Sequence, residues 1–243
     1  PAVFFEKKVH RIRRTTPDAA EIDDAVALLR SAQRPMIIAG GGVQYSRAVQ
    51  ELTKFAEDHQ IPVVETIAGR ANLTNDHPLN IGPIGVTGSD SANAIAAQAD
   101  VILAVGTRLQ DFTTGSRTLF GDAKLVAINV QPYDAAKHGA ISLVADARVA
   151  LQARSAELGG YRAAGADPAI RTGWLAAVDA HCAAPASGNE LPSDAQVIGA
   201  VQHVAGENTV VICAAGTMPG ELHKLWKAGK PGSYHMEYGF SCM

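Results

Sequence analysis

The sequence predicts an α/β protein built on a doubly wound parallel sheet, and three patterns carry this prediction. Short apolar runs, each about the length of one strand, alternate with segments whose apolar residues recur at helical spacing. The central run, residues 101–105, is continuously apolar, which is typical of a strand buried on both faces of a parallel sheet. Glycine-rich turns follow several of these runs, as at residues 40–42. Strands that alternate with helices form βαβ units, and such units build parallel sheets.

The expected strands and helices alternate through residues 18–158, which we interpret as one central α/β domain, Rossmann-like in type. The expected strands cover residues 36–39, 63–66, 101–105, 125–130 and 142–145. The expected helices begin with one capped by Asp18 and then cover residues 46–59, 90–98, 116–120 and 146–158. Residues 67–88, rich in Gly, Asn and Pro, form a longer connection than usual, so we expect a functional loop there.

Three further segments flank this domain. Residues 1–17 lack any helical or strand period and are interpreted as an inter-domain linker that packs as an irregular strand. Residues 159–191 are rich in small residues at both ends and are expected to be a connector with one helix. Residues 192–243 begin a second α/β unit, with a helix capped by Ser193, a strand, a loop and a short helix over residues 221–226. This incomplete unit cannot bury a core alone, so we expect the chain to be part of a longer protein.

The composition excludes several broad classes of function. The chain has 21 Lys and Arg against 24 Asp and Glu, and its net charge of -3 offers no general field for nucleic acid. The basic cluster at residues 7–14 is interpreted as part of a solvated linker. No apolar run approaches the ~20 residues of a membrane span, and no targeting signal is visible. Three scattered cysteines without a C-x-x-C pair are typical of a reducing cytoplasm, which we expect here.

Arg108 is the strongest single candidate for ligand binding, because it follows the central strand at the edge where open α/β sheets bind ligands. Its guanidinium could pair bidentately with a phosphate or carboxylate, and the alternative is a salt bridge to Asp111 or Asp134. Gly41 and Gly42 follow another strand but lack the G-x-G-x-x-G spacing. They could admit a diphosphate or could serve only a tight turn.

Other polar groups lie at neighbouring strand ends. Asn129 and Gln131 could bind ribose hydroxyls or a purine edge, or could satisfy a turn. Glu65 is the acidic residue placed to bind a ribose after the second strand. The loop from Gly82 to Ser89 leads into a helix N-terminus, where free N–H groups and the helix dipole favour an anion. The residue patterns therefore predict an anion or nucleotide site at this edge.

The histidines predict no metal site. His77, His138 and His223 have no second histidine at a ligand spacing. His235 and Glu237 alternate in a segment that could be a strand, where exposed polarity is the simpler interpretation. The sequence also contains neither a nucleophile elbow nor a P-loop.

The order of five segments resembles the thiamine diphosphate enzymes of the acetolactate synthase type. These segments are RPMIIAGGGV, ADVILAVGTRLQDFTTGS, INVQPYDAAKHG, LPSDAQVIGAVQ and VVICAAGTMPGELHKLWKAG. FFEKKVHRIRR near the start and PGSYHMEYGFSCM at the end resemble the hydrolase branch of this family more than its synthases. The resemblance covers essentially the whole chain.

The resemblance implies an enzyme of three α/β domains, of which this chain would hold the central one and the first third of the C-terminal one. The intact enzyme would use thiamine diphosphate and Mg²⁺ to cleave a carbon–carbon bond of a cyclic 1,2-diketone in inositol degradation, as a homodimer or homotetramer. The activating Glu and the GDG metal motif would lie outside this chain, so no catalytic residue and no metal ligand is assigned here, and the chain alone is expected to be inactive. The alternatives are a carboligase with structural FAD and a non-catalytic nucleotide-binding or assembly domain.

Residue-by-residue analogy gives two sets of candidate site residues. Gly216, Thr217 and Met218 match the family loop that reaches toward the cofactor diphosphate and the substrate, and Met243 matches the Met that supports the bent cofactor. A bulky apolar side chain suits that second task.

The second set lies in the central domain, where the synthases hold FAD. Its members fall on the corresponding strand ends and are Gly41, Gly42, Arg108 and Asn129. The hydrolase branch is not expected to need FAD, so this crevice is expected to be either a vestigial site or one for an ADP-type ligand.

Overall fold

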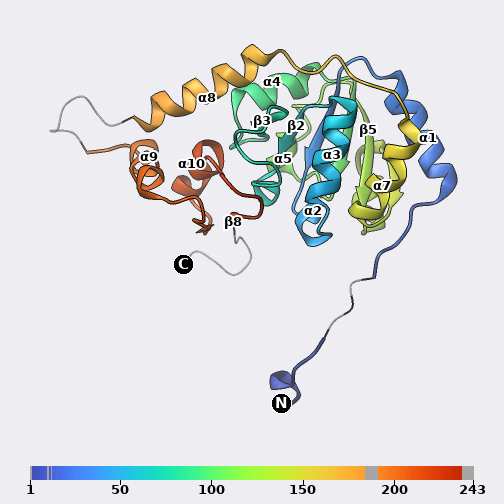
Figure 1. Ribbon diagram of the computed structural model, residues 1–243, viewed down its shortest axis with the longest axis horizontal. Coiled ribbons are helices and arrows are strands. Elements are labelled where there is room, and N and C mark those ends of the chain that lie inside the picture. The colour runs from blue at the N-terminus through green and yellow to red at the C-terminus, as the bar shows by residue number, and fades with distance from the viewer. Residues whose placement is uncertain (1, 10, 12, 184–190, 237–243) are drawn as a thin grey trace.

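In the computed structural model of the chain, six parallel strands form one sheet between two layers of helices (Figure 1). The structure describes residues 2–9, 11, 13–183 and 191–236, with the backbone alone for residues 2 and 154–156. The strand order is β3-β2-β1-β4-β5-β6, so the chain winds outward in both directions from the central pair β1 and β4. All neighbouring pairs are parallel, which confirms the predicted doubly wound fold.

The elements of this sheet domain follow one another as the βαβ pattern requires. The strands are β1 (Pro35–Ala39), β2 (Val63–Glu65), β3 (Asn80–Pro83), β4 (Val101–Val105), β5 (Lys124–Asn129) and β6 (Ile141–Val144). The helices are α1 (Ala19–Ser31), α2 (Gly42–Tyr45), α3 (Val49–His59), α4 (Asp90–Gln98), α5 (Asp111–Thr114), α6 (Pro132–Ala136) and α7 (Ala147–Leu158). Asp18 caps α1 by accepting a hydrogen bond from Ala20 N, as predicted.

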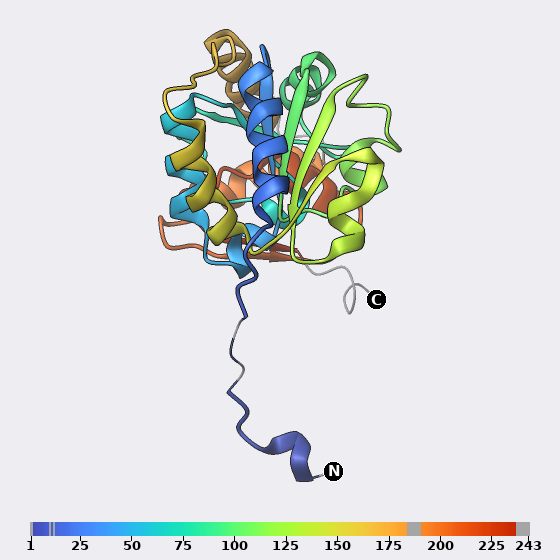
Figure 2. The same ribbon diagram turned by 90° about the vertical axis from the view of Figure 1, so that its right-hand side faces the viewer.

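Successive side chains of each inner strand supply two hydrophobic cores, because they point to opposite faces of the sheet. Leu103 of β4 belongs to the core shared with α1, α3 and α7. Its neighbours Ile102 and Ala104 belong to the core under α4. Figure 2 shows the helices layered on either side of the strands. All five residues of β4 are buried, which confirms the two-sided burial expected of this apolar run.

Three predicted elements of the sheet domain need correction, and one is the helix expected over residues 46–59, which begins at Val49 because Arg47 has a positive φ of 54°. The loop expected over residues 67–88 contains the strand β3, which its Gly82 and Pro83 concealed; both residues are tolerated because β3 is an edge strand. The helix expected over residues 116–120 is absent, and α5 lies just before it. Ser116 and Arg117 have positive φ angles of 53° and 69°, which a right-handed helix cannot accommodate.

The C-terminal part packs beside β3 and α4 rather than standing alone. It consists of α8 (Pro168–Cys182), α9 (Asp194–Val204), β7 (Val211–Cys213), α10 (Thr217–Leu225) and β8 (Tyr234–Met236), with β7 and β8 paired in parallel. Its core surrounds Trp174, Trp226 and Tyr234 and also includes Ala71 from the loop after β2. The helix α10 begins at Thr217, four residues before its predicted start, because Pro219 is tolerated in the first turn.

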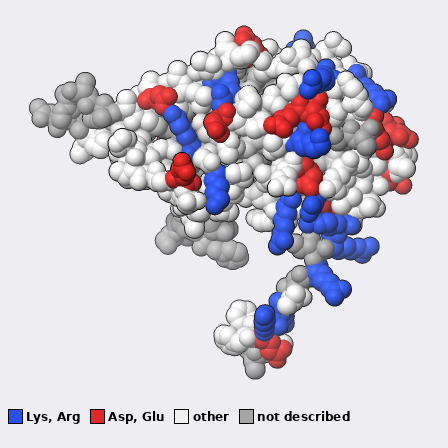
Figure 3. All heavy atoms as spheres, in the orientation of Figure 1, with Lys and Arg blue, Asp and Glu red and all other residues white. Residues whose placement is uncertain are grey.

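The N-terminal segment leaves the body of the molecule as an extended arm (Figures 1 and 2). Its described residues form a short 3₁₀ turn, Ala2–Phe5, and no strand, so the expected irregular strand is wrong for them. Basic side chains gather along the arm and where it meets the body (Figure 3). Arg14 fastens the arm by donating to Ser46 O and to Asp146, at 2.7 and 2.8 Å. None of the helices in the described part of the chain is long and apolar enough to cross a bilayer.

Replacing Asp146 by alanine is expected to lower the free energy of unfolding by about 1–2 kcal/mol, because one carboxylate serves two structures. Its Oδ1 caps α7 by accepting from Arg148 N and Val149 N, and it also holds Arg14. Asp146→Asn keeps the cap and loses only the charge pairing, so it should cost less. Urea unfolding followed by circular dichroism measures both, and an equal loss in the two variants would contradict this division.

Candidate functional site

A cleft of about 840 Å³ opens at the carboxyl edge of the sheet, where β1 and β4 lie side by side. The strand order reverses at this point, and open α/β sheets bind ligands at such a switch point. The four candidate residues of the central domain all line this one cleft, and they are Gly41, Gly42, Arg108 and Asn129. Arg13 from the arm and the rings of Tyr45 and Phe112 also line it.

The glycines after β1 allow two backbones to approach closely. A Cβ on Gly40 would lie 2.3 Å from Gly106 O, and one on Gly42 would lie 2.6 Å from Gly106 Cα. Gly42 N also donates to Gly106 O at 2.9 Å. Close packing against Gly106 therefore accounts for Gly40 and Gly42, while Gly41 borders the cleft opposite Ala68.

Arg108 has an exposed side chain at the mouth of the cleft. Its alternative role, a salt bridge to Asp111 or Asp134, is not found among the described residues, because Asp134 binds Lys137 Nζ at 2.7 Å instead. The same Lys137 Nζ donates to Arg108 O at 3.0 Å, which holds the backbone of Arg108. The Arg108 guanidinium is thereby left available for an anionic ligand.

Asn129 uses both ends of its amide within the protein. Its Nδ2 donates to Thr107 O and its Oδ1 accepts from Gln131 N, each at 3.0 Å. This geometry supports the turn interpretation of Asn129 and Gln131 over ribose binding. Asn129 still forms part of the cleft wall.

Glu65, the acidic residue that the sequence places at a ribose-type position, is not accessible to a ribose. Its side chain is fully buried, and its Oε2 lies 2.6 Å from Arg70 Nη1. Its other oxygen accepts from Leu73 N at 2.9 Å. The loop after β2 folds over the end of this strand and closes it to ligands.

Several donors of the loop from Gly82 to Ser89, the other anion site expected from the sequence, are used within the protein. Gly85 N donates to Asn93 Oδ1 at 3.0 Å, and Ser89 N donates to Pro83 O at 2.7 Å. Ser89 Oγ caps α4 by accepting from Ala92 N. The loop and the start of α4 therefore offer an anion fewer free N–H donors than expected.

The candidate thiamine diphosphate residues lie at the start of α10. Gly216 has φ 141° and ψ −172°, a conformation open essentially to glycine alone, and it gives the helix no side-chain cap. In the described part of the chain no side chain caps Thr217 N or Met218 N, and Pro219, the third residue of the helix, has no N–H. Two such free N–H groups suit a phosphate. Thr217 and Met218 follow directly, and Met218 is 40% exposed. This arrangement fits a diphosphate, whereas Met243 and Glu237 lie outside the described residues.

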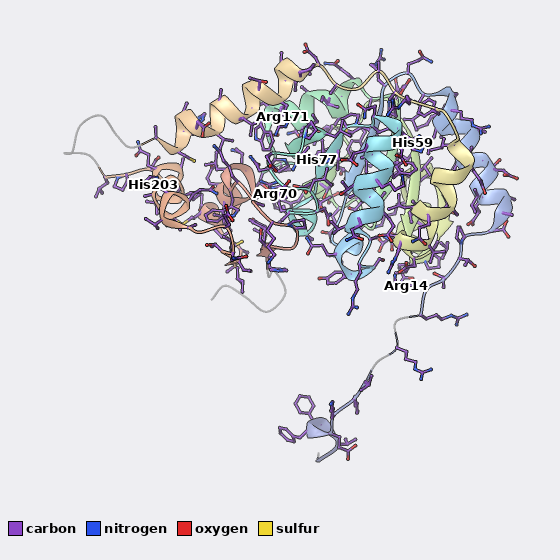
Figure 4. The ribbon with its side chains drawn as sticks, viewed as in Figure 1. Arg14, His59, Arg70, His77, Arg171 and His203 are labelled. Carbon is purple, nitrogen blue, oxygen red and sulfur yellow. The ribbon has the colours of Figure 1, made fainter. Side chains whose placement is uncertain are left out.

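The histidines singled out from the sequence make separate contacts in the described part of the chain. His77 lies 3.2 Å from Glu57 and is labelled in Figure 4, and His138 contacts Leu109 O. His235 lies in β8 and is exposed, as expected. Within the described ranges, no three His, Cys, Asp or Glu side chains are grouped so that they could hold a metal ion.

A polar cluster that the sequence did not predict is formed by the buried side chains of Glu65, Arg70 and His223, with the half-buried Thr87 beside them. Arg70 Nε donates to His223 O at 3.1 Å, and His223 Nδ1 lies 3.0 Å from Thr87 Oγ1. Burial, with the charge of Arg70, lowers the pKa of His223 to about 3. One signal existed: Arg70 is the one charged residue within residues 66–75.

Comparison with known protein families identifies the class to which this chain belongs. Residues 22–153, more than half of the chain, match the family described as thiamine pyrophosphate enzyme, central domain. The chain therefore belongs to this family.

Curated relatives resemble the chain over its whole length. A 3D-(3,5/4)-trihydroxycyclohexane-1,2-dione hydrolase of Geobacillus thermodenitrificans is 40% identical over 266 aligned positions, covering 100% of this chain and 42% of the relative. Proteins of the same name from Bacillus cereus (hydrolase 1) and Bacillus anthracis are 39% and 37% identical, with the same coverage. The chain thus spans less than half the length of these relatives.

Proposed function

We propose that this chain is the central part of a thiamine diphosphate-dependent hydrolase that cleaves a carbon–carbon bond of a cyclic 1,2-diketone in inositol degradation. The observation that carries the proposal is similarity to hydrolases of that name over 100% of the chain, beyond the central domain alone. In this proposal residues 1–17 are a linker, 18–158 the central domain, 159–191 a connector and 192–243 the start of the cofactor-binding domain.

The residues of this chain would hold the cofactor rather than perform the chemistry. When bound, thiamine diphosphate supplies a nucleophilic carbon and an electron sink for carbon–carbon cleavage. Gly216, Thr217 and Met218 would bind its diphosphate, supported by the uncapped start of α10, and Met243 would support its bent form. The catalytic Glu and the Mg²⁺ ligands would come from outside this chain.

The central cleft is proposed as a nucleotide crevice for an ADP-type ligand. Its size suits a small-molecule ligand, and the Arg108 guanidinium, which has no salt bridge among the described residues, suits an anionic one. The names of the relatives do not favour the FAD-containing carboligase. We also propose a homodimer or homotetramer in a reducing cytoplasm; the free thiols of Cys182 and Cys213 are consistent with that compartment.

Calorimetric titration of thiamine diphosphate with Mg²⁺ tests the proposal. The 243-residue chain should show no tight binding, because most of the cofactor site would lie elsewhere. The full-length enzyme should bind both and release an open-chain acid from the cyclic 1,2-diketone, without flavin absorbance. Tight binding by the chain alone, or a full-length protein that leaves the diketone intact, would overturn it.

A further inference from the structure

Arg70 joins the loop after β2 to the far end of α10. It is completely buried, and its guanidinium pairs with Glu65 at 2.6 Å. Its remaining donors reach the carbonyl oxygens of His223 and Trp226, at 3.1 and 2.5 Å. Figure 4 shows Arg70 between the sheet and the C-terminal helices. One side chain therefore connects parts of the chain more than 150 residues apart.

The position of these two carbonyls makes the contact specific for α10. They lie at the last turn of the helix, where carbonyl groups lack helical partners and the helix dipole is negative. A buried guanidinium with a fixed planar fork satisfies both oxygens and its carboxylate partner together. Lysine has no such fork, so it cannot replace this set of contacts.

A second contact fixes the orientation of the same helix. His223 Nδ1 lies 3.0 Å from Thr87 Oγ1 and 3.1 Å from Thr87 O, in the loop after β3. A Cβ on Gly220 would lie 3.2 Å from Thr87 Cγ2, so the helix backbone also packs against this loop. The helix is thus held from two loops at the carboxyl edge of the sheet.

The other end of α10 carries Gly216, Thr217 and Met218. The helix has nine residues, so its last turn lies only about 14 Å from its first, and backbone hydrogen bonds join the two turns. Displacement at Arg70 is therefore transmitted to its first turn. We infer that Arg70, held by Glu65, is a positioning residue that fixes the orientation of α10. This orientation places residues 216–218 where they can bind the cofactor diphosphate, an inference that rests on the proposed function.

The test compares Arg70→Lys with Leu52→Ala in the full-length enzyme. Leu52 is fully buried in the core shared with α1 and α7, away from α10, so its truncation lowers thermal stability without touching the helix. Calorimetry measures the affinity for thiamine diphosphate, and hydrogen exchange reports on the amides of residues 217–225. Glu65→Gln is the milder second variant, to be used if Arg70→Lys does not fold.

We expect Arg70→Lys to weaken thiamine diphosphate binding about 10- to 100-fold, as is typical when a group that orients ligands is removed. Hydrogen exchange of the α10 amides should also become faster in Arg70→Lys, whereas Leu52→Ala should change neither this exchange nor the affinity for thiamine diphosphate. Equal affinity in Arg70→Lys and wild type, or equal weakening in both variants, would overturn the positioning role alone. A wild-type enzyme without affinity for thiamine diphosphate would overturn the proposed function itself.

Discussion

Glu65→Ala should lower the free energy of unfolding of the 243-residue chain by about 3–5 kcal/mol, because it leaves the buried charge of Arg70 without a carboxylate partner. Arg70 is fully buried, and Glu65 provides the opposite charge in the contacts that the structure describes for it. The change also leaves Leu73 N without its acceptor. Urea unfolding followed by circular dichroism measures the loss.

An exposed ion pair provides the matched control. Lys54 and Asp58 on α3 lie 2.8 Å apart, but the Lys54 side chain is 72% exposed. Such a pair contributes about 0.3–0.5 kcal/mol, so Lys54→Ala should scarcely change the stability. Glu65→Gln keeps acceptor and donor groups in place and should fall between the two variants. Equal costs for Glu65→Ala and Lys54→Ala would show that the buried pair adds nothing specific.

The parts of the fold that the sequence predicted are those set by local patterns. The continuous apolar run of residues 101–105 and the cap at Asp18 each need only near neighbours to be understood, and both are confirmed. The strand β3 escaped prediction because it is short and contains Gly82 and Pro83. Its place at the sheet edge, which makes those residues acceptable, depends on the strand order and cannot be deduced from the strand itself.

The candidate site, too, could be predicted only where local patterns determine it. Strand-end residues such as Gly41 and Arg108 could be placed on one sheet edge from the βαβ pattern, and the structure lines one cleft with them. The role of Glu65 could not be deduced, because its partner Arg70 turns back over the strand end, and Arg70 in turn depends on carbonyls at His223 and Trp226. Contacts over such separations are decided by tertiary packing, which no local pattern encodes.

The last prediction concerns acid, and it follows from His223. Complete burial, with the positive charge of Arg70 adding to the effect, lowers the pKa of this imidazole from 6.5 to about 3. The unfolded chain therefore binds more protons than the folded chain between these two pH values. As a result, the contribution of His223 to the free energy of unfolding is fully present above pH 6.5 and is lost as the pH drops toward 3. At pH 5 the loss amounts to about 2 kcal/mol, since each pKa unit corresponds to about 1.4 kcal/mol.

Between pH 6.5 and 5 the titration of His223 is separated from that of Asp76 and Asp100. The pKa of Asp76 is lowered from its usual 3.8, mainly by the hydrogen bond from Thr74. Burial raises the pKa of Asp100, but hydrogen bonds from backbone N–H groups outweigh burial and lower it overall. Both carboxylates therefore lose their charge only in stronger acid. In His223→Gln, the free energy of unfolding measured by urea titration should fall much less between pH 6.5 and 5 than it does in the wild type. His203→Gln, at an exposed position on α9 labelled in Figure 4, should keep the wild-type loss. If His223→Gln retains that loss in full, the acid sensitivity does not originate in the buried cluster.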